Sequence, residues 1–365
     1  MDIGAIEREL TSLWQAASAD ESSGVIRSST LNLLVYAPAD SDLRALDDIV
    51  ADITAAHPCR AVVMIVDAQG QTPSISAEVT SLCRLSPGDS GKQVCCEQVT
   101  VNASGSQIGE VPSAIAPLLI PDLPVYLWWR AVPRLEDKAL FRKLTEISDR
   151  VVIDSAQFGD PVVQINNLAA ILKTTPSWAA VSDVNWARLT AWRGLLAGFY
   201  DVAEYRPLLE QLSRVVIEHS LPEGTDAPIS ARALLLGGWL ASRLGWRLSD
   251  QRSGEGVHDF IFEAQEARVT LEFRATERQI EPGRLSKVVF ESAADQSALF
   301  SVRRSTDSMR LETAVVMGQE NRSQRVLSYE NLSEAALISR ELQIFGNDRV
   351  YEQAVLGAAS LATHL

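Results

Sequence analysis

The sequence lacks the residue patterns that most catalytic and metal sites require. It contains four cysteines and four histidines. The cysteines form no Cys-x-x-Cys pair and the histidines are scattered, so the spacing of a zinc site is absent. No GxSxG, GxxxxGK(S/T) or HExxH motif occurs, and Gly254 and Gly256 lack the third glycine and preceding strand of a dinucleotide site. We therefore expect no catalytic residue, no metal ligand and no cofactor.

Long apolar runs are also missing. A membrane-spanning helix needs ~20 consecutive apolar residues, and no window of the chain approaches that length. The segment Met1–Leu10 is acidic and helical in pattern, unlike the basic start of a signal peptide. We expect a cytoplasmic protein with reduced thiols. The formal net charge of −14 repels nucleic acid and anionic membranes, which favours a protein partner instead.

The first half of the chain has the pattern of an α/β domain with a mixed sheet. Strand-like runs alternate with helical ones, and residues 61–66 are continuously apolar, as in strands buried on both faces. Ser41 or Asp42 is positioned to cap a helix with an apolar stripe from Leu43 to Ile53. Strands are predicted at 30–37, 61–66, 74–85, 92–102, 125–130 and 150–154, and helices at 5–17, 43–56, 135–147 and 162–173. The first domain is predicted to span residues 1–178.

The second half, residues 179–365, has the pattern of an α+β domain with a mainly antiparallel sheet. Two strongly apolar helices, 183–200 and 231–246, precede a run of alternating segments. Ser333 is positioned to cap a further helix, and an alanine-rich helix follows at 350–362. Strands are predicted at 214–218, 257–264, 267–275, 285–292, 298–304 and 309–316. The whole chain is therefore predicted to be mixed α/β, with two domains.

The two strand-like runs before residue 103 form a predicted hairpin that carries three cysteines. If Leu85 faces Lys92, Cys83 lies opposite Val94, and a slip of one residue places Cys83 opposite Cys95. Opposed Cα atoms in a non-hydrogen-bonded pair lie ~4.5 Å apart, which is within disulfide reach. Cys83, with Cys95 or Cys96, is therefore a redox candidate. The alternative is that these are inert buried thiols, the commoner state of free cysteine.

A short strand ending in Trp128, Trp129 and Arg130 is the other candidate site. Strand alternation places Trp129 on one face, and Trp128 with Arg130 on the other. Both tryptophans could be core residues, but Trp and Arg are also common interface anchors. Trp128 and Arg130, with the nearby Asp122, are the predicted partner-interface residues. Otherwise Arg130 is expected to form an ion pair with Asp122 or Asp154.

The same segment carries a family resemblance. Residues 111–130, which end in Pro-Asp-Leu-Pro-Val-Tyr-Leu-Trp-Trp-Arg, resemble the central motif of the glucose-6-phosphate dehydrogenase assembly proteins, the OpcA family. Three further blocks are similar to the family, namely His57-Pro-Cys-Arg60, Asn185–Arg193 and Ala233–Trp246. The resemblance implies a non-catalytic allosteric activator that binds glucose-6-phosphate dehydrogenase, stabilises its active oligomer and so acts in the pentose phosphate pathway. Cyanobacterial relatives are linked to thioredoxin. Since all cysteines precede residue 97, a thiol switch here would act through the first domain.

Two alternatives remain open at this point. The chain could bind a sugar phosphate, or be an enzyme in its own right, with a basic pocket built on Arg60, Arg130 and Arg193. It could also be a scaffold without an enzyme partner. The sequence does not order those three arginines into one site.

Overall fold

The computed structural model divides into two compact units that are interleaved along the chain. It describes residues 3–18, 24–27, 29–85, 92–131, 138–174, 179–254, 256–264, 267–276, 280–293, 298–329, 332–344 and 346–365. Unit 1 comprises Met1–Asp154, Thr175–Asp183 and Ser333–Asn347, and unit 2 comprises Ser155–Thr174, Val184–Leu332 and Asp348–Leu365. The chain therefore passes between the two units several times. Each unit combines helices with its own sheet, which confirms the mixed α/β class.

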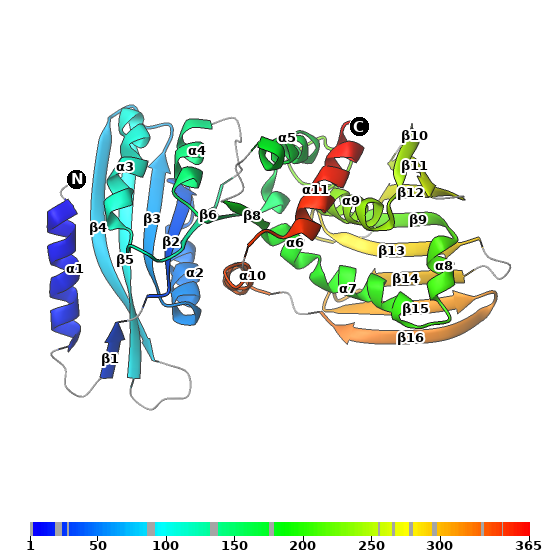
Figure 1. The fold of residues 1–365 in the computed structure, drawn as a ribbon, viewed down its shortest axis with the longest axis horizontal. Helices are drawn as coiled ribbons and strands as arrows, with labels where there is room; N and C mark the ends of the chain where they lie inside the picture. The colour runs from blue at the N-terminus through cyan, green and yellow to red at the C-terminus, as the bar shows by residue number, and fades with distance from the viewer. Residues whose placement is uncertain are drawn as a thin grey trace. The chain divides into compact units, whose positions relative to one another are not determined.

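Unit 1 is built on a sheet whose strands are parallel except for one (Figure 1). In spatial order the strands are β1 (Gly24–Arg27), β5 (Lys92–Ser104), β3 (Cys59–Asp67), β2 (Leu31–Pro38), β6 (Val125–Trp129), β7 (Arg150–Ile153) and β8 (Ala180–Asp183), with β4 (Ser74–Leu85) antiparallel to β5. Its helices are α1 (Ile3–Ser18), α2 (Leu43–Ala56), α3 (Val111–Ile115), α4 (Lys138–Glu146) and α10 (Glu334–Glu341), with 3₁₀ turns η1 (Gly105–Glu110) and η2 (Ala116–Leu118).

The central strands of this sheet are buried along their length, as their sequences predict. Every residue of β6 is buried, and β3 is buried from Cys59 to Val66. Parallel strands covered on both faces are rich in apolar residues without alternation, which is the pattern here. The helix α2 begins after Asp42, whose carboxylate accepts the backbone N–H groups of Arg44 and Ala45 at 3.1 Å each. The predicted cap is thus Asp42 rather than Ser41.

The order of the parallel strands is that of a doubly wound fold. Counting β2 as the first strand, the sequence β5-β3-β2-β6-β7-β8 corresponds to the order 3-2-1-4-5-6. The chain therefore winds away from the centre in both directions, and the reversal lies between β2 and β6. One connection departs from this plan, because the antiparallel strand β4 joins β3 to β5 in place of a helix.

Unit 2 contains a second sheet that is mainly antiparallel. In spatial order its strands are β10 (Arg247–Gly254), β11 (Val257–Ala264), β12 (Ala267–Ala275), β9 (Leu212–His219), β13 (Leu285–Ser292), β14 (Ala298–Arg304), β15 (Arg310–Met317) and β16 (Glu320–Ser328). Its helices are α5 (Pro161–Thr174), α6 (Val184–Arg188), α7 (Thr190–Gly198), α8 (Arg206–Glu210), α9 (Ala231–Leu244) and α11 (Arg349–Ala362), with 3₁₀ turns η3 (Ser155–Gln157) and η4 (Phe199–Asp201). The predicted strands form, but β10 and β16 were not predicted because they are almost wholly exposed and polar.

Helices pack on one face of the second sheet. The rings of Phe199, just after α7, and Phe300 of β14 lie 5.4 Å apart. On α9, a Cβ at Gly237 would meet the side chains of Leu271 and Phe273 in β12. Register places Leu271, Val215, Phe290 and Phe300 on the same face of the sheet. Above them α9 crosses α11 closely, since a Cβ at Gly238 would overlap backbone atoms of Ala354 and Ala358.

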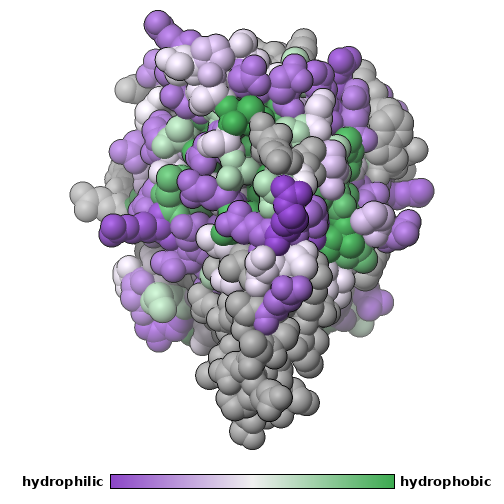
Figure 2. All heavy atoms as spheres, turned by 90° about the vertical axis from the view of Figure 1, so that its left-hand side faces the viewer, coloured by the Kyte–Doolittle hydropathy of each residue, from purple (hydrophilic) through white to green (hydrophobic). Residues whose placement is uncertain are grey.

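The surface of unit 1 is mixed in hydropathy. Figure 2 faces the side on which α1 and β4 lie and shows hydrophilic residues interrupted by separate hydrophobic patches. Among the residues that the structure describes, no helix is long and apolar enough to span a bilayer.

Candidate functional site

The carboxyl end of the first sheet, at the reversal between β2 and β6, is the position where doubly wound folds place their ligands. Here it is filled by aromatic rings. Tyr36 of β2 and Trp129 of β6 are register partners, and their rings stack with centroids 3.7 Å apart and an interplanar angle of 1°. The ring of Phe141 in α4 meets Trp129 edge-on at 5.0 Å. Because Trp129 is buried and stacked on Tyr36, it is a core residue at the carboxyl end of the first sheet.

Trp128 and Arg130 lie on the opposite face of the strand, as alternation predicts. Trp128 is 1% exposed, and the guanidinium carbon of Arg130 lies 5.8 Å from its ring centroid. The Arg130 backbone N–H donates to Tyr36 O at 2.9 Å, which continues the β2–β6 ladder past Trp129. Arg130 therefore covers Trp128 at the end of the strand.

The ion-pair partner of Arg130 is Glu334, with Nε and Oε1 3.5 Å apart. The expectation of Asp122 or Asp154 was wrong. Glu334 begins α10, a helix from the last part of the chain that packs against α2 within unit 1. Glu334 lies so far from Arg130 in the sequence that no local pattern indicates this pairing.

The turn before β6 is held by a buried side chain that the sequence analysis also missed. Asn32 of β2 is fully buried. Its Nδ2 donates to Ile120 O and Leu123 O at 3.0 and 3.3 Å, and its Oδ1 accepts the Ile120 N–H at 2.8 Å. The exposed Asp122 sits within this turn at φ 63°, a left-handed conformation in which Asp is several-fold enriched. The turn thus presents Asp122 on a fixed backbone.

The cysteine hairpin adopts the slipped register. Cys83 pairs with Cys95 across β4 and β5, and Leu82 pairs with Cys96. The side chains of Cys83 and Cys95 lie outside the described residues, so their redox role stays a prediction. Cys59 and Cys96 are buried free thiols, and burial raises the pKa of both. Since the thiolate is the reactive form, these two are unfavourable nucleophiles.

Of the three arginines of the alternative phosphate pocket, Arg60 and Arg130 lie apart within the first sheet and Arg193 belongs to the other unit. Arg60 lies at the amino end of β3, where its Nε is 2.6 Å from Glu97 Oε2 and its Nη1 donates to Leu118 O at 2.7 Å. Arg130 follows the carboxyl end of β6, and both strands run parallel to β2. Arg60 and Arg130 are therefore at opposite ends of one sheet. Arg193 belongs to unit 2, where its guanidinium carbon lies 3.6 Å from the ring centroid of Trp186.

The turn after β2 does not fit a dinucleotide. In doubly wound dinucleotide-binding folds, glycines in this turn let the pyrophosphate approach the free N–H groups at the start of the next helix. Here the turn contains no glycine between Ala37 and Asp42, and the Asp42 carboxylate accepts two of those N–H groups. A phosphate group at this turn would be repelled by the Asp42 carboxylate and would lack the two N–H donors that Asp42 already occupies. One feature does match, because Asp67 ends β3 where an acidic residue binds ribose in that fold.

The described residues form neither a metal cluster nor, around Ser213, a pocket with converging polar groups. No group of three or more His, Cys, Asp or Glu side chains in the described ranges is arranged to hold a metal.

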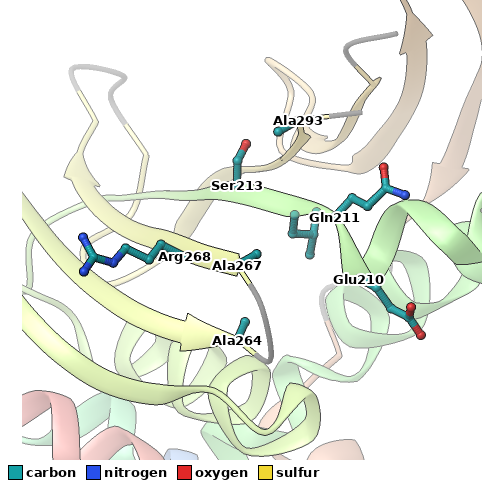
Figure 3. Close-up of a pocket in the computed structure, with 8 residues that line it drawn as sticks. Glu210, Gln211, Ser213, Ala264, Ala267, Arg268 and Ala293 are labelled. Carbon is teal, nitrogen blue, oxygen red and sulfur yellow. The ribbon is translucent and has the colours of Figure 1, made fainter. Parts of the chain in front are cut away.

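A hollow of about 720 Å³ at the ends of β9, β11 and β12 is shown in Figure 3, where Glu210 and Arg268 extend away from one another. Ser213 in this hollow is already bound to Glu291 O at 3.2 Å. The hollow therefore offers no convergent set of polar groups.

A doubly wound, mainly parallel sheet in one unit and a mainly antiparallel sheet in the other define a two-domain α/β fold that is also found among solved structures. The structure is similar to that of a 3-ketoreductase from Actinomadura kijaniata solved with TDP-benzene and NADP. The TM-score is 0.50 at 12% sequence identity, and the match covers 92% of this chain and 97% of that one. At this identity the likeness shows the fold alone.

The sequence comparisons identify the family. The profile of the "Glucose-6-phosphate dehydrogenase subunit N-terminal domain" matches residues 50–170, and that of the corresponding C-terminal domain matches residues 179–355. The chain belongs to the OpcA family of glucose-6-phosphate dehydrogenase assembly proteins, as the resemblance indicated. An OpcA protein of Synechococcus elongatus, named for the OxPP cycle, is 28% identical over 87% of this chain and 70% of its own length. The OpcA protein of Nostoc punctiforme is 27% identical over 84% of this chain and 66% of its own length.

Proposed function

We propose that this protein is a non-catalytic assembly factor that binds glucose-6-phosphate dehydrogenase and stabilises its active oligomer. The family match over both halves of the chain carries the proposal, because both matched domains are described as parts of a glucose-6-phosphate dehydrogenase subunit. The closed end of the first sheet supports the non-catalytic part. Helix α2 is capped by Asp42 and the switch point holds the Tyr36–Trp129 stack, so this doubly wound sheet lacks the features that receive a dinucleotide.

Activation without catalysis requires only differential binding. If the protein binds the active oligomer of the dehydrogenase more tightly than its inactive form, the equilibrium shifts by the ratio of the two affinities. A tenfold preference corresponds to about 1.4 kcal/mol. None of the residues of this chain then needs to touch the substrate.

The proposed contact surface includes Asp122 and Arg130. Asp122 is exposed on the turn that Asn32 fixes, and the side chain of Arg130 is 20% exposed beside Glu334. Trp128 lies beneath Arg130 and would act by holding the arginine in place. Rigid presentation of charged groups favours binding because less side-chain freedom is lost on association.

The test is co-purification with the cognate dehydrogenase, followed by its activity on glucose 6-phosphate with and without this chain. We expect a complex and a higher activity. In Arg130→Ala the complex should weaken, whereas Arg142→Ala on the exposed face of α4 should leave it unchanged. Asp122→Asn removes the charge and keeps the left-handed turn, so it isolates electrostatics from folding. Absence of a complex together with unchanged kinetics would rule out the proposal.

The rival function is a sugar-phosphate-binding protein or an enzyme in its own right. The reductase-like fold and Asp67 at the end of β3 are the observations that favour it. Calorimetric titration of the isolated chain with glucose 6-phosphate and with NADP separates the two ideas. Stoichiometric binding or turnover by the isolated chain would support the rival.

A further inference from the structure

The second sheet ends in a strand that has no neighbour on its outer edge among the described strands. This strand is β16, which pairs with β15 on its inner edge (Figure 1). The Tyr329 N–H donates to Met309 O at 2.8 Å. Because an antiparallel strand bonds a given neighbour at every second residue, the backbone N–H and C=O groups of Gln324, Val326 and Ser328 point away from β15. The outer edge of β16 therefore offers hydrogen-bonding groups to a further strand.

A hollow lies beside this edge, between β16 and the helix α7. It has a volume of about 370 Å³ and is lined by residues of α7, the turn after α7, β15 and β16. Its apolar lining includes Leu195, Phe199 and Leu327. A Cβ at Gly194, which also lines the hollow, would meet no atom within 4 Å. The helix therefore leaves room for an apolar side chain next to the edge strand. We call this space the edge hollow.

The charged side chains that line the edge hollow are basic. They are Arg322 and Arg325, on a chain whose net charge is −14. Arg322 forms an ion pair with the exposed Glu320 at 3.0 Å. Within the described ranges no carboxylate forms an ion pair with Arg325. A carboxylate brought by a partner would therefore meet a guanidinium that is able to bind it through two hydrogen bonds.

Apolar side chains are exposed where the edge hollow opens. Val326 is 54% exposed, Leu327 39% and Val202 46%. A register shift against β15 falls before Ser323, so residues 323–328 keep a regular strand pairing. Edge strands are commonly protected by charges, by proline or by such bulges. Here the bulge lies at one end of β16, and the rest of the edge is left apolar and regular.

We propose that β16 binds an extended acidic segment of a partner protein by strand addition. The segment pairs its backbone with the outer edge of residues 324–328, sets a carboxylate at Arg325 and inserts an apolar side chain into the edge hollow. In this mode of recognition, main-chain pairing provides affinity and pockets for alternate side chains provide specificity. The proposal does not rest on the dehydrogenase complex, because β16 belongs to unit 2 whereas Asp122 and Arg130 belong to unit 1.

Charge selects an acidic segment over a second copy of this chain. Two-fold pairing of β16 with itself about Val326 would set Arg325 opposite Leu327 of the other copy. The Arg325 side chains of the two copies would then be diagonal neighbours on one face, with a separation of ~7–8 Å. These like charges repel, and both copies also carry −14. An acidic segment presents the opposite charge to Arg325 instead.

The test is the fluorescence anisotropy of a labelled peptide, Thr-Leu-Val-Glu-Val-Glu-Val-Thr, titrated with the full chain. When extended, this peptide carries its leucine and both glutamates on one face. We expect saturable binding that weakens at least about tenfold in Arg325→Glu, because a hydrogen bond to a charged group contributes that much. Arg252→Glu is the matched control, since Arg252 is exposed on β10, the opposite edge strand of the same sheet. That variant should bind as the unmodified chain does.

Three outcomes of this titration would overturn the proposal. They are the absence of saturable binding, an equal loss of affinity in Arg325→Glu and Arg252→Glu, and equal binding of a peptide that carries lysine in place of both glutamates. Circular dichroism spectra and melting temperatures of the variants show that each one is folded.

Methylated peptides separate strand addition from charge attraction alone. Only every second amide of an added strand faces β16. N-methylation of that set should abolish binding, whereas N-methylation of the other set should have a much smaller effect. Equal effects of the two sets would contradict strand addition.

The edge hollow is tested by filling it from α7. Gly194→Leu places a side chain in the open space and also improves the helix propensity. We expect weaker peptide binding without a lower melting temperature, and unchanged binding would overturn the role of the hollow. Sedimentation velocity of the isolated chain tests the other occupant. A dimer that the peptide dissociates would assign β16 to self-association and overturn the proposal.

Discussion

The two sheets of this protein differ in how their strands and charged residues are buried. The sheet of unit 1 is parallel, and its central strands are buried on both faces from end to end. The sheet of unit 2 is mainly antiparallel, its edge strands β10 and β16 are almost wholly exposed, and β15 alternates buried with partly exposed residues. Parallel strands require crossovers that cover both faces, whereas antiparallel hairpins leave one face free. The first sheet therefore holds the Arg60–Glu97 pair inside, whereas the Arg303–Glu312 pair of the second sheet reaches solvent.

This difference predicts where a charge matters for the stability of the fold. Arg60 in the first sheet neutralises the buried Glu97. Arg303 in the second sheet pairs with Glu312 in contact with solvent. The same residue type should therefore have unequal effects on folding in the two sheets.

The largest expected effect is that of Arg60→Ala. Removing one partner of a buried ion pair leaves an uncompensated charge, and we expect the free energy of unfolding to fall by about 3–5 kcal/mol. Arg303→Ala, the matched exposed arginine, should lower it by less than about 1 kcal/mol. Urea denaturation followed by tryptophan fluorescence measures both. Equal losses of unfolding free energy in Arg60→Ala and Arg303→Ala would contradict the difference between the two sheets.

Gly238→Ala tests how closely the helices cover one face of the second sheet. A methyl group there would overlap the backbone of α11 at Ala354 and Ala358. Overpacking of this kind costs about 1–3 kcal/mol. Gly194→Ala on α7 meets no atom within 4 Å and should stabilise the helix by up to about 1 kcal/mol. Thermal melting of both variants gives the sign, and a harmless Gly238→Ala would mean that the helices are not in contact.

His219 gives a pH-dependent measure of burial on the covered side of the second sheet. Burial lowers the pKa of His219 from 6.5 to about 4. The unfolded chain therefore binds a proton before the folded one does, and the stability contributed by the neutral imidazole is complete above pH 6.5 and is lost as the pH falls towards 4. In His219→Gln the free energy of unfolding should depend less on pH within that window. Urea titrations at several pH values measure how the free energy of unfolding changes with pH. The same pH dependence in His219→Gln and in the unmodified protein would contradict the burial of His219.

The smallest effect concerns the thiols of the first sheet. Burial raises the pKa of Cys59 and Cys96, so they should react slowly with a thiol reagent in the folded state. The double variant Cys59→Ser, Cys96→Ser should leave the fast phase of the reaction unchanged. A reduced fast phase would show that one of these thiols is accessible. Counting the fast thiols with and without reductant tests the Cys83–Cys95 bond in the same experiment.

Helices and strands whose pattern is local could be predicted from the sequence. Continuous apolar runs predicted β2, β3 and β6, and the capping residues Asp42 and Ser333 predicted two helix starts that the structure confirms. The motif ending in Arg130 predicted the family, and the profile matches confirm it. Local patterns succeed here because they depend on backbone sterics and burial, which neighbouring residues decide.

The strands β10 and β16 were missed for the opposite reason. Their residues are polar and exposed, so nothing in their own sequence requires a strand. They form because β11 and β15 offer unpaired backbone groups along one edge, and pairing there satisfies those groups.

By itself the sequence determined the fold class, the family and the absence of catalytic motifs, since these rest on composition, periodicity and adjacent residues. Only the tertiary structure decided which residues meet. It paired Arg130 with Glu334, stacked Tyr36 on Trp129, separated Arg60 from Arg130 and set Cys83 opposite Cys95. Contacts between strands follow from register and crossover. Register and crossover depend on how distant segments pack together, which no local pattern records.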